Sequence, residues 1–413
     1  MDDGDRVRRQ VGRLGESAPV KVGITCYPTY GGSGALATEL GIALAHRGHE
    51  VHFITYQQPF RLPAFTPGIY FHEVDVGRYP LFEYPPYDLA LAVRMHEVTL
   101  AHSLDLLHCH YAIPHATSAW IAQEMLKQSK RDIRVVTTLH GTDITIVGQD
   151  PSFRPITKFS IEKSDGLTAV SRYLQTETLT TFGCTACRIE VIPNFVDPEV
   201  YDRSRYPSIL TEQVDAGKRV LMHISNFRAV KRVTDVVKIF AEVEREVPSV
   251  LMMVGDGPDR VEAEAEARAL DLQDKVFFLG KIDAVAPLLA GADLFLLPSN
   301  TESFGLSALE ALASGVPVIG SKAGGLPEVV RDGETGFLCQ VGDIDAMAFA
   351  ALGLLRDRDR WHAMSSLAAQ DARERFSRDA IVGEYEAFYE YTLSSPSGAE
   401  RNARAAADPG GAA

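Results

Sequence analysis

Residues 20–55 read VKVGITCYPTYGGSGALATELGIALAHRGHEVHFIT, and the pattern changes three times along them. An apolar run of strand length at 20–26 is broken by four small residues at 31–34. The amphipathic run at 35–47 predicts a helix, and residues 50–55 predict a second strand. A strand, a glycine-rich turn, a helix and a strand in this order are typical of a parallel α/β sheet.

The same alternation continues along the chain in two series, one ending near residue 192 and one beginning near 219. After residue 55 the first series has predicted strands at 104–108, 134–139, 166–169 and 188–192, and helices at 116–128 and 156–163. The second series has predicted strands at 219–224, 250–254, 276–279, 294–297 and 317–321, and helices at 233–247, 261–270, 285–290 and 305–313. This repetition predicts two doubly wound α/β halves.

The chain is expected to form two domains, because 413 residues exceed one ordinary domain. Residues 194–217, rich in Pro, Asp, Ser and Tyr, carry no alternation and predict a hinge. The predicted parts are a flexible tail at 1–18, an N-terminal domain at 19–197, a C-terminal domain at 198–377, a helix at 378–393 that crosses back to the first domain, and a disordered tail at 394–413.

Composition argues against several classes of protein. The net charge of −14 disfavours a nucleic-acid surface, because a phosphate-binding footprint needs basic character. Apolar runs are shorter than the ~20 residues that span a bilayer, and the first residues contain no apolar stretch. A cytoplasmic protein without a signal peptide or stable membrane insertion is therefore expected. Cys184 and Cys187 lack the context of a redox motif or the second pair of a zinc site, which favours a loop feature over either.

The unusual residues of the chain follow predicted strands, where open parallel sheets bind ligands. Gly31, Gly32, Ser33 and Gly34 follow the first strand, where glycines admit a close backbone approach and a helix start favours an anion. The motif lacks the G-x-G-x-x-G spacing and the acidic residue of a nicotinamide site, so that cofactor is disfavoured. A plain tight turn is the alternative.

Histidines gather after two other strands. His140 begins the sequence HGTD at the end of the strand at 134–139 and is expected to face a cleft, although a lone histidine is more often structural. His108, His110 and His115 have no carboxylate among them, so a metal site is not expected there.

Three cations follow the first strand of the second half, at Arg228, Lys231 and Arg232. In an acidic protein they suit a diphosphate that gains charge as a leaving group. A solvated helix start is the alternative, although cations are disfavoured there unless an anion compensates.

Two glutamates, Glu302 and Glu310, lie eight residues apart near the end of the strand at 294–297. If the interval is largely helical, it climbs about 12 Å, which exceeds the ~5–9.5 Å between the carboxylates of hydrolytic pairs. The spread suits instead two hydroxyl-rich groups at opposite ends of a long ligand. Hydrolysis is thereby disfavoured.

Together these motifs resemble retaining glycosyltransferase family 4, whose members have the α/β GT-B fold of two facing Rossmann-like domains with a central cleft. The motifs that carry the resemblance are at 31–34, 140–143, 231, 255–258, 302 with 310, and 324–328, and the resemblance covers about 20–393. Within the family, the stretches at 24–28, 52–55, 84–90, 110–116 and 224–228 are similar to enzymes of bacillithiol biosynthesis. Those enzymes transfer GlcNAc from UDP-GlcNAc to the hydroxyl of L-malate, with retention at the anomeric carbon.

The resemblance implies roles for matching residues on the donor side. It places Glu310 on the ribose hydroxyls and Glu302 on the hydroxyls of the sugar. It places the diphosphate on Arg228 and Lys231, with backbone N–H groups near Gly31, Gly32, Ser33, Phe304 and Gly305. His140 would contact the 6-hydroxyl side of the sugar. The implied catalytic residues are His140, Lys231, Arg228 and Glu302. Many relatives have Gly-Arg where Ser225-Asn226 stand here, which shifts the cationic role to Arg228.

On the acceptor side the resemblance implies contacts from Ser33, Tyr111, Thr138 and Asn194, with Lys158 as a carboxylate partner. Retention fits a front-face mechanism in which the leaving phosphate takes the acceptor's proton, so no general base is needed. No D-x-D sequence directly follows a predicted strand, and neither a metal nor another cofactor is expected. Two alternatives to this function stay open. One is another acceptor, either a small molecule, a glycan or a lipid, and the other is a nucleotide-sugar-binding protein without turnover. A homodimer also stays open.

Overall fold

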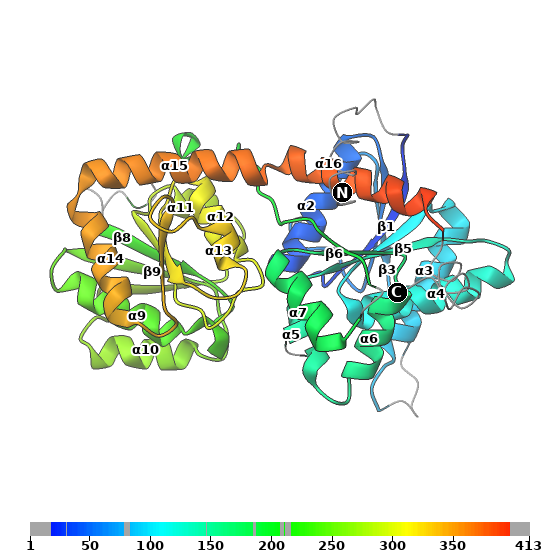
Figure 1. The fold of residues 1–413 in the computed structure, drawn as a ribbon, viewed down its shortest axis with the longest axis horizontal. Helices are drawn as coiled ribbons and strands as arrows, with labels where there is room; N and C mark the ends of the chain where they lie inside the picture. The colour runs from blue at the N-terminus through cyan, green and yellow to red at the C-terminus, as the bar shows by residue number, and fades with distance from the viewer. Residues whose placement is uncertain are drawn as a thin grey trace, which may run out of the picture. The chain divides into compact units, whose positions relative to one another are not determined.

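The computed structural model describes residues 18–29, 31–77, 83–145, 147–184, 187–206, 210 and 216–396. The tails predicted at 1–18 and 394–413 lie outside these residues, apart from 18 and 394–396. The chain divides into two compact units, Met1–Ile192 with Asp379–Ala413 and Pro193–Arg378. Each unit has its own parallel sheet with helices around it (Figure 1).

The first unit is built on a seven-stranded sheet in the order β3-β2-β1-β4-β5-β6-β7, with every pair parallel. Its strands are β1 (Lys21–Thr25), β2 (Glu50–Thr55), β3 (Ile69–Glu73), β4 (Leu106–His110), β5 (Arg134–Leu139), β6 (Gly166–Ala169) and β7 (Ile189–Val191). Its helices are α2 (Gly32–His46), α3 (Tyr87–His102), α4 (Thr117–Gln128), α5 (Thr142–Thr145), α6 (Arg154–Lys163), α7 (Arg172–Phe182) and α16 (Arg378–Ser394). The order reverses between β1 and β4, which is where such sheets leave room for a ligand.

The second unit repeats this plan with a six-stranded parallel sheet in the order β10-β9-β8-β11-β12-β13. Its strands are β8 (Arg219–Ile224), β9 (Ser249–Val254), β10 (Val276–Gly280), β11 (Leu294–Leu297), β12 (Val318–Ser321) and β13 (Gly336–Cys339). Its helices are α9 (Val233–Glu244), α10 (Arg260–Ala269), α11 (Ala286–Leu289), α12 (Leu306–Ala313), α13 (Leu326–Val329), α14 (Ile344–Arg356) and α15 (Arg358–Phe376). The reversal lies between β8 and β11. The prediction of two α/β halves is confirmed.

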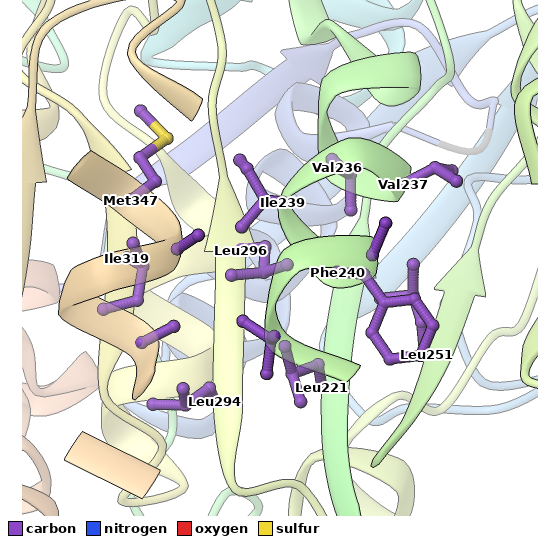
Figure 2. Close-up of a cluster of buried hydrophobic side chains, with 14 of the residues drawn as sticks. Leu221, Val236, Val237, Ile239, Phe240, Leu251, Leu294, Leu296, Ile319 and Met347 are labelled. Atoms are coloured by element: carbon purple, nitrogen blue, oxygen red, sulfur yellow. The ribbon is translucent and has the colours of Figure 1, made fainter. Parts of the chain in front are cut away.

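The core of the second unit shows why these segments fold as they do. Strands β8 and β11 are almost continuously apolar and buried, as is typical of parallel strands covered on both faces. Figure 2 shows Ile239 of α9 on the side of Leu296 and of Met347 on α14. Phe240 of the same helix lies on the side of Leu251 of β9. Leu221 and Leu296 supply the facing surface of the sheet and are fully buried. This packing holds the carboxyl ends of β8 and β11 in fixed positions.

Helix α16 follows the second unit in sequence but packs, from Asp379 onward, within the first unit. Glu386 accepts from Arg47 at 2.6 Å and lies 3.0 Å from His49. The hydroxyl of Tyr389 lies 2.6 Å from Nδ1 of His108, which is fully buried. The chain therefore passes between the units twice.

Candidate active site

The turn after β1 brings the backbone against the start of α2. A Cβ atom on Gly34 would lie 2.3 Å from the backbone oxygen of Tyr27, so a larger residue would displace the turn. Helix α2 begins at Gly32, and no side chain caps it. The N–H groups of its first turn therefore suit an anion such as a phosphate.

Three of the predicted residues meet beside this turn. The Tyr111 hydroxyl donates to the Ser33 hydroxyl at 3.0 Å. The rings of Tyr111 and His140 are 5.3 Å apart, and Nε2 of His140 lies 2.9 Å from Nδ1 of His110. Helix α2 and the chain just after β4 and β5 thus contribute to one polar cluster.

Asp143, the last residue of the HGTD sequence, joins the two loops that carry Tyr111 and His140. Its carboxylate accepts from the N–H groups of Ala112 and Gly141, both at 3.0 Å. Burial raises its pKa to about 6, although these hydrogen bonds oppose the rise. The motif alone does not indicate this positioning role, because the partner Ala112 is distant in sequence.

The histidines of this cluster are neutral. Burial lowers the pKa of His140 and of His108 to about 3 and that of His115 to about 4. Burial also holds the pKa of His110 well below its usual value. A neutral imidazole has one donor and one acceptor nitrogen, so His110 and His140 can share one hydrogen bond. His140 can therefore exchange hydrogen bonds with a sugar hydroxyl, but it carries no positive charge.

In the second unit, the two central residues of the predicted donor site are paired with each other. Nζ of Lys231 lies 2.7 Å from Oε1 of Glu302, which also accepts from the Ser299 hydroxyl at 2.7 Å. The two charged side chains are 20% and 10% exposed, so water screens them only in part. Lys231 follows β8 and Glu302 follows β11, the two strands at the reversal of the sheet. The contact of Ser299 is not predicted, although its position just after a strand is a signal for it.

Glycine loops hold the backbone on either side of this pair. Gly325 donates to the backbone oxygen of Glu302 at 2.7 Å. A Cβ atom on Gly324, whose φ is +61°, would lie 2.1 Å from that oxygen. On the other side, a Cβ atom on Gly255, with φ +121°, would lie 1.8 Å from the backbone oxygen of Ser225. The motifs at 255–258 and 324–328 thus position the backbone around the predicted donor residues.

Glu310 lies on α12 and is 7% exposed. It accepts from the Tyr201 hydroxyl at 2.6 Å. Tyr201 belongs to the segment expected to be a hinge, where no pattern indicates a role. Phe304 is buried and packs edge-on against Phe376 at 5.6 Å. Gly305, with φ +98°, is the N-cap residue directly before α12.

Arg228 is exposed on the loop after β8, and among the described residues no carboxylate forms an ion pair with it. By contrast, Arg232 is held by Asp235 and Asn300, at 2.7 and 3.0 Å. Arg228 is therefore available to an anionic ligand, whereas Arg232 stabilises the start of α9.

Two family models match the chain, Glycosyltransferase Family 4 at residues 30–200 and Glycosyl transferases group 1 at residues 211–371. The N-acetyl-alpha-D-glucosaminyl L-malate synthase of Bacillus anthracis is 49% identical over 371 residues, covering 90% of this chain and 96% of that protein. The chain belongs to glycosyltransferase family 4. A second relative, the D-inositol 3-phosphate glycosyltransferase of Nocardia farcinica, is 27% identical over 83% of this chain and 81% of that protein.

Solved structures of glycosyltransferases share the fold. Sucrose-phosphate synthase from Thermosynechococcus elongatus has a TM-score of 0.74 and 22% identity, covering 91% of this chain and 100% of that one. Anabaena HepE in complex with UDP and glucose has a TM-score of 0.70 and 21% identity, with the same coverage. At these identities the likeness shows the fold alone, and it confirms the GT-B prediction.

The acceptor prediction for Thr138 disagrees with its place in this glycosyltransferase. Thr138 is fully buried, and its hydroxyl lies 2.7 Å from Nε2 of His108 and 2.7 Å from the hydroxyl of Thr168. These bonds join β4, β5 and β6, and they contradict a side-chain contact with an acceptor. Thr138 therefore positions the buried His108 of this cluster.

The other two predicted acceptor residues are Lys158 and Asn194. Lys158 on α6 donates to the backbone oxygen of Phe182 at 2.7 Å and pairs with Glu162 at 2.9 Å, which argues against a role as the carboxylate partner. Asn194 belongs to the second unit and is 7% exposed. Its Oδ1 is buried without a hydrogen-bond partner among the described residues, so its role stays a prediction.

Among the described residues of the glycosyltransferase, no helix is both long and apolar enough to cross a bilayer. Cys184 and Cys187, expected to be a loop feature, are joined as a disulfide just after α7.

Proposed function

We propose that this glycosyltransferase transfers GlcNAc from UDP-GlcNAc to the hydroxyl of L-malate, with retention at the anomeric carbon. The observation that carries the proposal is the sequence identity of 49% to a protein named N-acetyl-alpha-D-glucosaminyl L-malate synthase. The aligned region covers 96% of that protein. The more distant relatives, such as the D-inositol 3-phosphate glycosyltransferase, are 27% identical. Bacillithiol biosynthesis is the pathway that the resemblance of the sequence implies.

The second unit supports the donor half of the proposal. Arg228 and Lys231 supply positive charge for the diphosphate, whose charge grows as the bond to the sugar breaks. Glu302 accepts from sugar hydroxyls, and Glu310 accepts from the ribose hydroxyls. Because Tyr201 already holds one oxygen of Glu310 at 2.6 Å, this carboxylate is oriented before the donor binds.

The first unit supports the acceptor half and the reacting face of the sugar. Ser33 and Tyr111 offer hydroxyl groups beside the uncapped start of α2, which suits an anion. L-malate carries two carboxylates, so it needs such donors. His140 is neutral because burial lowers its pKa to about 3, and it positions the sugar through a hydroxyl.

The proposed reaction needs no side chain to act as a general base. The bond between the anomeric carbon and the β-phosphate oxygen breaks, and the malate hydroxyl forms a bond to the same face of that carbon. The hydroxyl proton passes to the leaving phosphate, so the products are GlcNAc-malate and UDP. We expect the transfer to proceed without a metal, and a chelator should leave its rate unchanged. A cytoplasmic location fits both proposed substrates, which are water-soluble anions.

A panel of acceptors tests the proposal. UDP release from UDP-GlcNAc is measured with L-malate, with D-malate, with succinate, and with inositol 3-phosphate. We expect release with L-malate, none with succinate, which lacks the hydroxyl, and little with D-malate. Release with inositol 3-phosphate but none with L-malate would overturn the acceptor while leaving the family intact. Tight UDP binding with no release for any acceptor would indicate a binding protein without turnover.

A further inference from the structure

Three histidines meet at one edge of the first unit's sheet, outside the loops that carry the candidate active site. His52 lies on β2, His72 on the edge strand β3, and His102 in the last turn of α3. The His102 ring is 4.6 Å from that of His52 and 5.1 Å from that of His72. None of the three has a role in the proposed transfer reaction.

The ring nitrogens of this cluster converge. One nitrogen from each histidine lies within 4.8 Å of the other two, and Nδ1 of His52 is 2.8 Å from Nε2 of His72. Imidazole nitrogens bind zinc, copper and nickel ions. The nitrogen–metal distance for zinc is about 2.0–2.1 Å. Small rotations of the partly exposed rings of His72 and His102 would therefore bring all three nitrogens to one ion.

Glu50 orients the buried histidine for this role. Its Oε1 lies 2.9 Å from Nε2 of His52 and 3.2 Å from Nζ of Lys21. An ionised carboxylate only accepts hydrogen bonds, so Nε2 of His52 carries the proton and the lone pair of Nδ1 points toward His72. Histidines that bind a metal usually donate their other ring N–H to a carboxylate or a backbone carbonyl. This hydrogen bond fixes the tautomer of the histidine.

Burial makes the cluster asymmetric, with one fixed side and one open side. His52 is fully buried, and the ring of Tyr70 stacks on it at 4.9 Å. His72 and His102 are only partly buried, which leaves a path for an ion and for water as a further ligand.

We propose that His52, His72 and His102 form a binding site for one divalent transition-metal ion of the zinc class, with Glu50 as the positioning residue of His52. On binding, the Nε2 proton of His72 moves to Nδ1, and the metal replaces the His52–His72 hydrogen bond. The ion joins the end of α3 to the two outermost strands, so its effect is on the stability of the first unit and not on the transfer reaction.

Metal titration of the full chain tests the site. After treatment with a chelator, Zn²⁺ is added while binding is followed by calorimetry and the melting temperature by scanning calorimetry. We expect one ion per chain and a melting temperature that rises with Zn²⁺, because a ligand that binds only the folded state stabilises it. His72→Gln and His102→Gln should each weaken binding by more than about tenfold, and Glu50→Gln by about 10–100-fold. Co²⁺ in place of Zn²⁺ should give the visible absorption of a histidine-bound ion.

His96→Gln is the matched control, because His96 lies on the same helix α3 but outside the cluster. It should bind Zn²⁺ as the unaltered chain does. All variants should retain the unaltered melting temperature without metal to within a few degrees, and the partly exposed His72 and His102 are chosen for this reason. Absence of binding at micromolar Zn²⁺, or binding that survives in both His72→Gln and His102→Gln, would overturn the proposal and leave a cluster joined by hydrogen bonds alone.

Discussion

Lys231 and Glu302 form an ion pair of 2.7 Å that joins the carboxyl ends of two neighbouring strands, β8 and β11. The pair is mostly shielded from water, and Ser299 supplies a further hydrogen bond to the carboxylate. A carboxylate that can bind sugar hydroxyls thus lies beside a cation that can bind a phosphate. We expect Lys231 to be in position before the nucleotide sugar binds, because Glu302 already holds its ammonium group.

Replacing Lys231 with alanine is expected to lower kcat more than it changes the KM for UDP-GlcNAc. Charge develops on the leaving phosphate in the transition state, so the lost cation matters most there. Removing one group that stabilises developing charge lowers kcat by about 10²–10³-fold. Steady-state kinetics with L-malate in excess measure both constants. Arg232→Gln is the control, because Arg232 is bonded to Asp235, and it should change kcat little. An unchanged kcat in Lys231→Ala contradicts the role.

Replacing Glu310 with alanine should raise the KM for UDP-GlcNAc. Two hydrogen bonds from the ribose to a carboxylate would be lost, each worth about 1–3 kcal/mol, so a rise of at least tenfold is expected. The KM for L-malate should stay the same. Tyr201→Phe keeps the carboxylate but removes the 2.6 Å bond that orients it, and a smaller rise is expected. Donor kinetics that do not change in Glu310→Ala refute the ribose contact.

The pH profile of transfer should contain no step from His140. Burial takes its pKa down to about 3, so the ring loses its proton far below neutral pH and stays neutral above it. Between about pH 5.5 and 8, where an ordinary histidine titrates, kcat/KM should therefore have the same shape in the unaltered enzyme and in His140→Asn, at a lower level in the variant. A step near pH 6.5 that disappears only in His140→Asn would show that a charged His140 takes part.

Asp143 should make the stability of the first unit depend on pH. Its pKa is raised from 3.8 to about 6, so the folded state holds the proton more tightly than the unfolded state. The stabilisation from protonated Asp143 is complete below the pKa of the unfolded state and is lost as pH rises through about 6. It amounts to about 1.4 kcal/mol for each unit by which the pKa is raised. The free energy of unfolding, relative to Asp143→Asn, should therefore fall between pH 4 and 6 and stay level above.

Tryptophan fluorescence during urea unfolding can measure this effect in one unit. Trp120 lies on α4 of the first unit and Trp361 on α15 of the second, and the chain has two tryptophans. In a Trp361→Phe background the signal then reports on the first unit. The other titrating groups cancel in the comparison with Asp143→Asn. A difference between the two proteins that does not vary with pH contradicts the assignment of the titration to Asp143.

The sequence predicts most of the fold because its strands are short apolar runs that end at glycines and polar residues. The strand predicted at 134–139 is β5 to the residue. The strand predicted at 104–108 is instead β4, Leu106–His110, because two histidines inside a buried strand break the apolar pattern on which the prediction relies. The edge strand β3 is half exposed and was not predicted, since its residues Ile69–Glu73 lack a buried pattern.

Within the candidate site, residues in short motifs are the predictable ones. Ser33 and His140 lie in such motifs, and the structure brings both to Tyr111. The resemblance implies an acceptor contact for Thr138, but the position of a residue in a family pattern does not show that its hydroxyl is held by His108 and Thr168 on the neighbouring buried strands. Tyr201 escapes prediction for another reason, since its partner Glu310 is distant in sequence and only the folded chain brings them together.

We expect this chain to join GlcNAc to L-malate with retention at the anomeric carbon. The most direct test is to incubate the chain with UDP-GlcNAc and L-malate and to determine the product by mass spectrometry and proton NMR. We expect one product, formed in equal amount to UDP, with the mass of GlcNAc-malate and an anomeric proton coupling typical of the α configuration. A β-linked product, or free GlcNAc with no malate adduct, would contradict it.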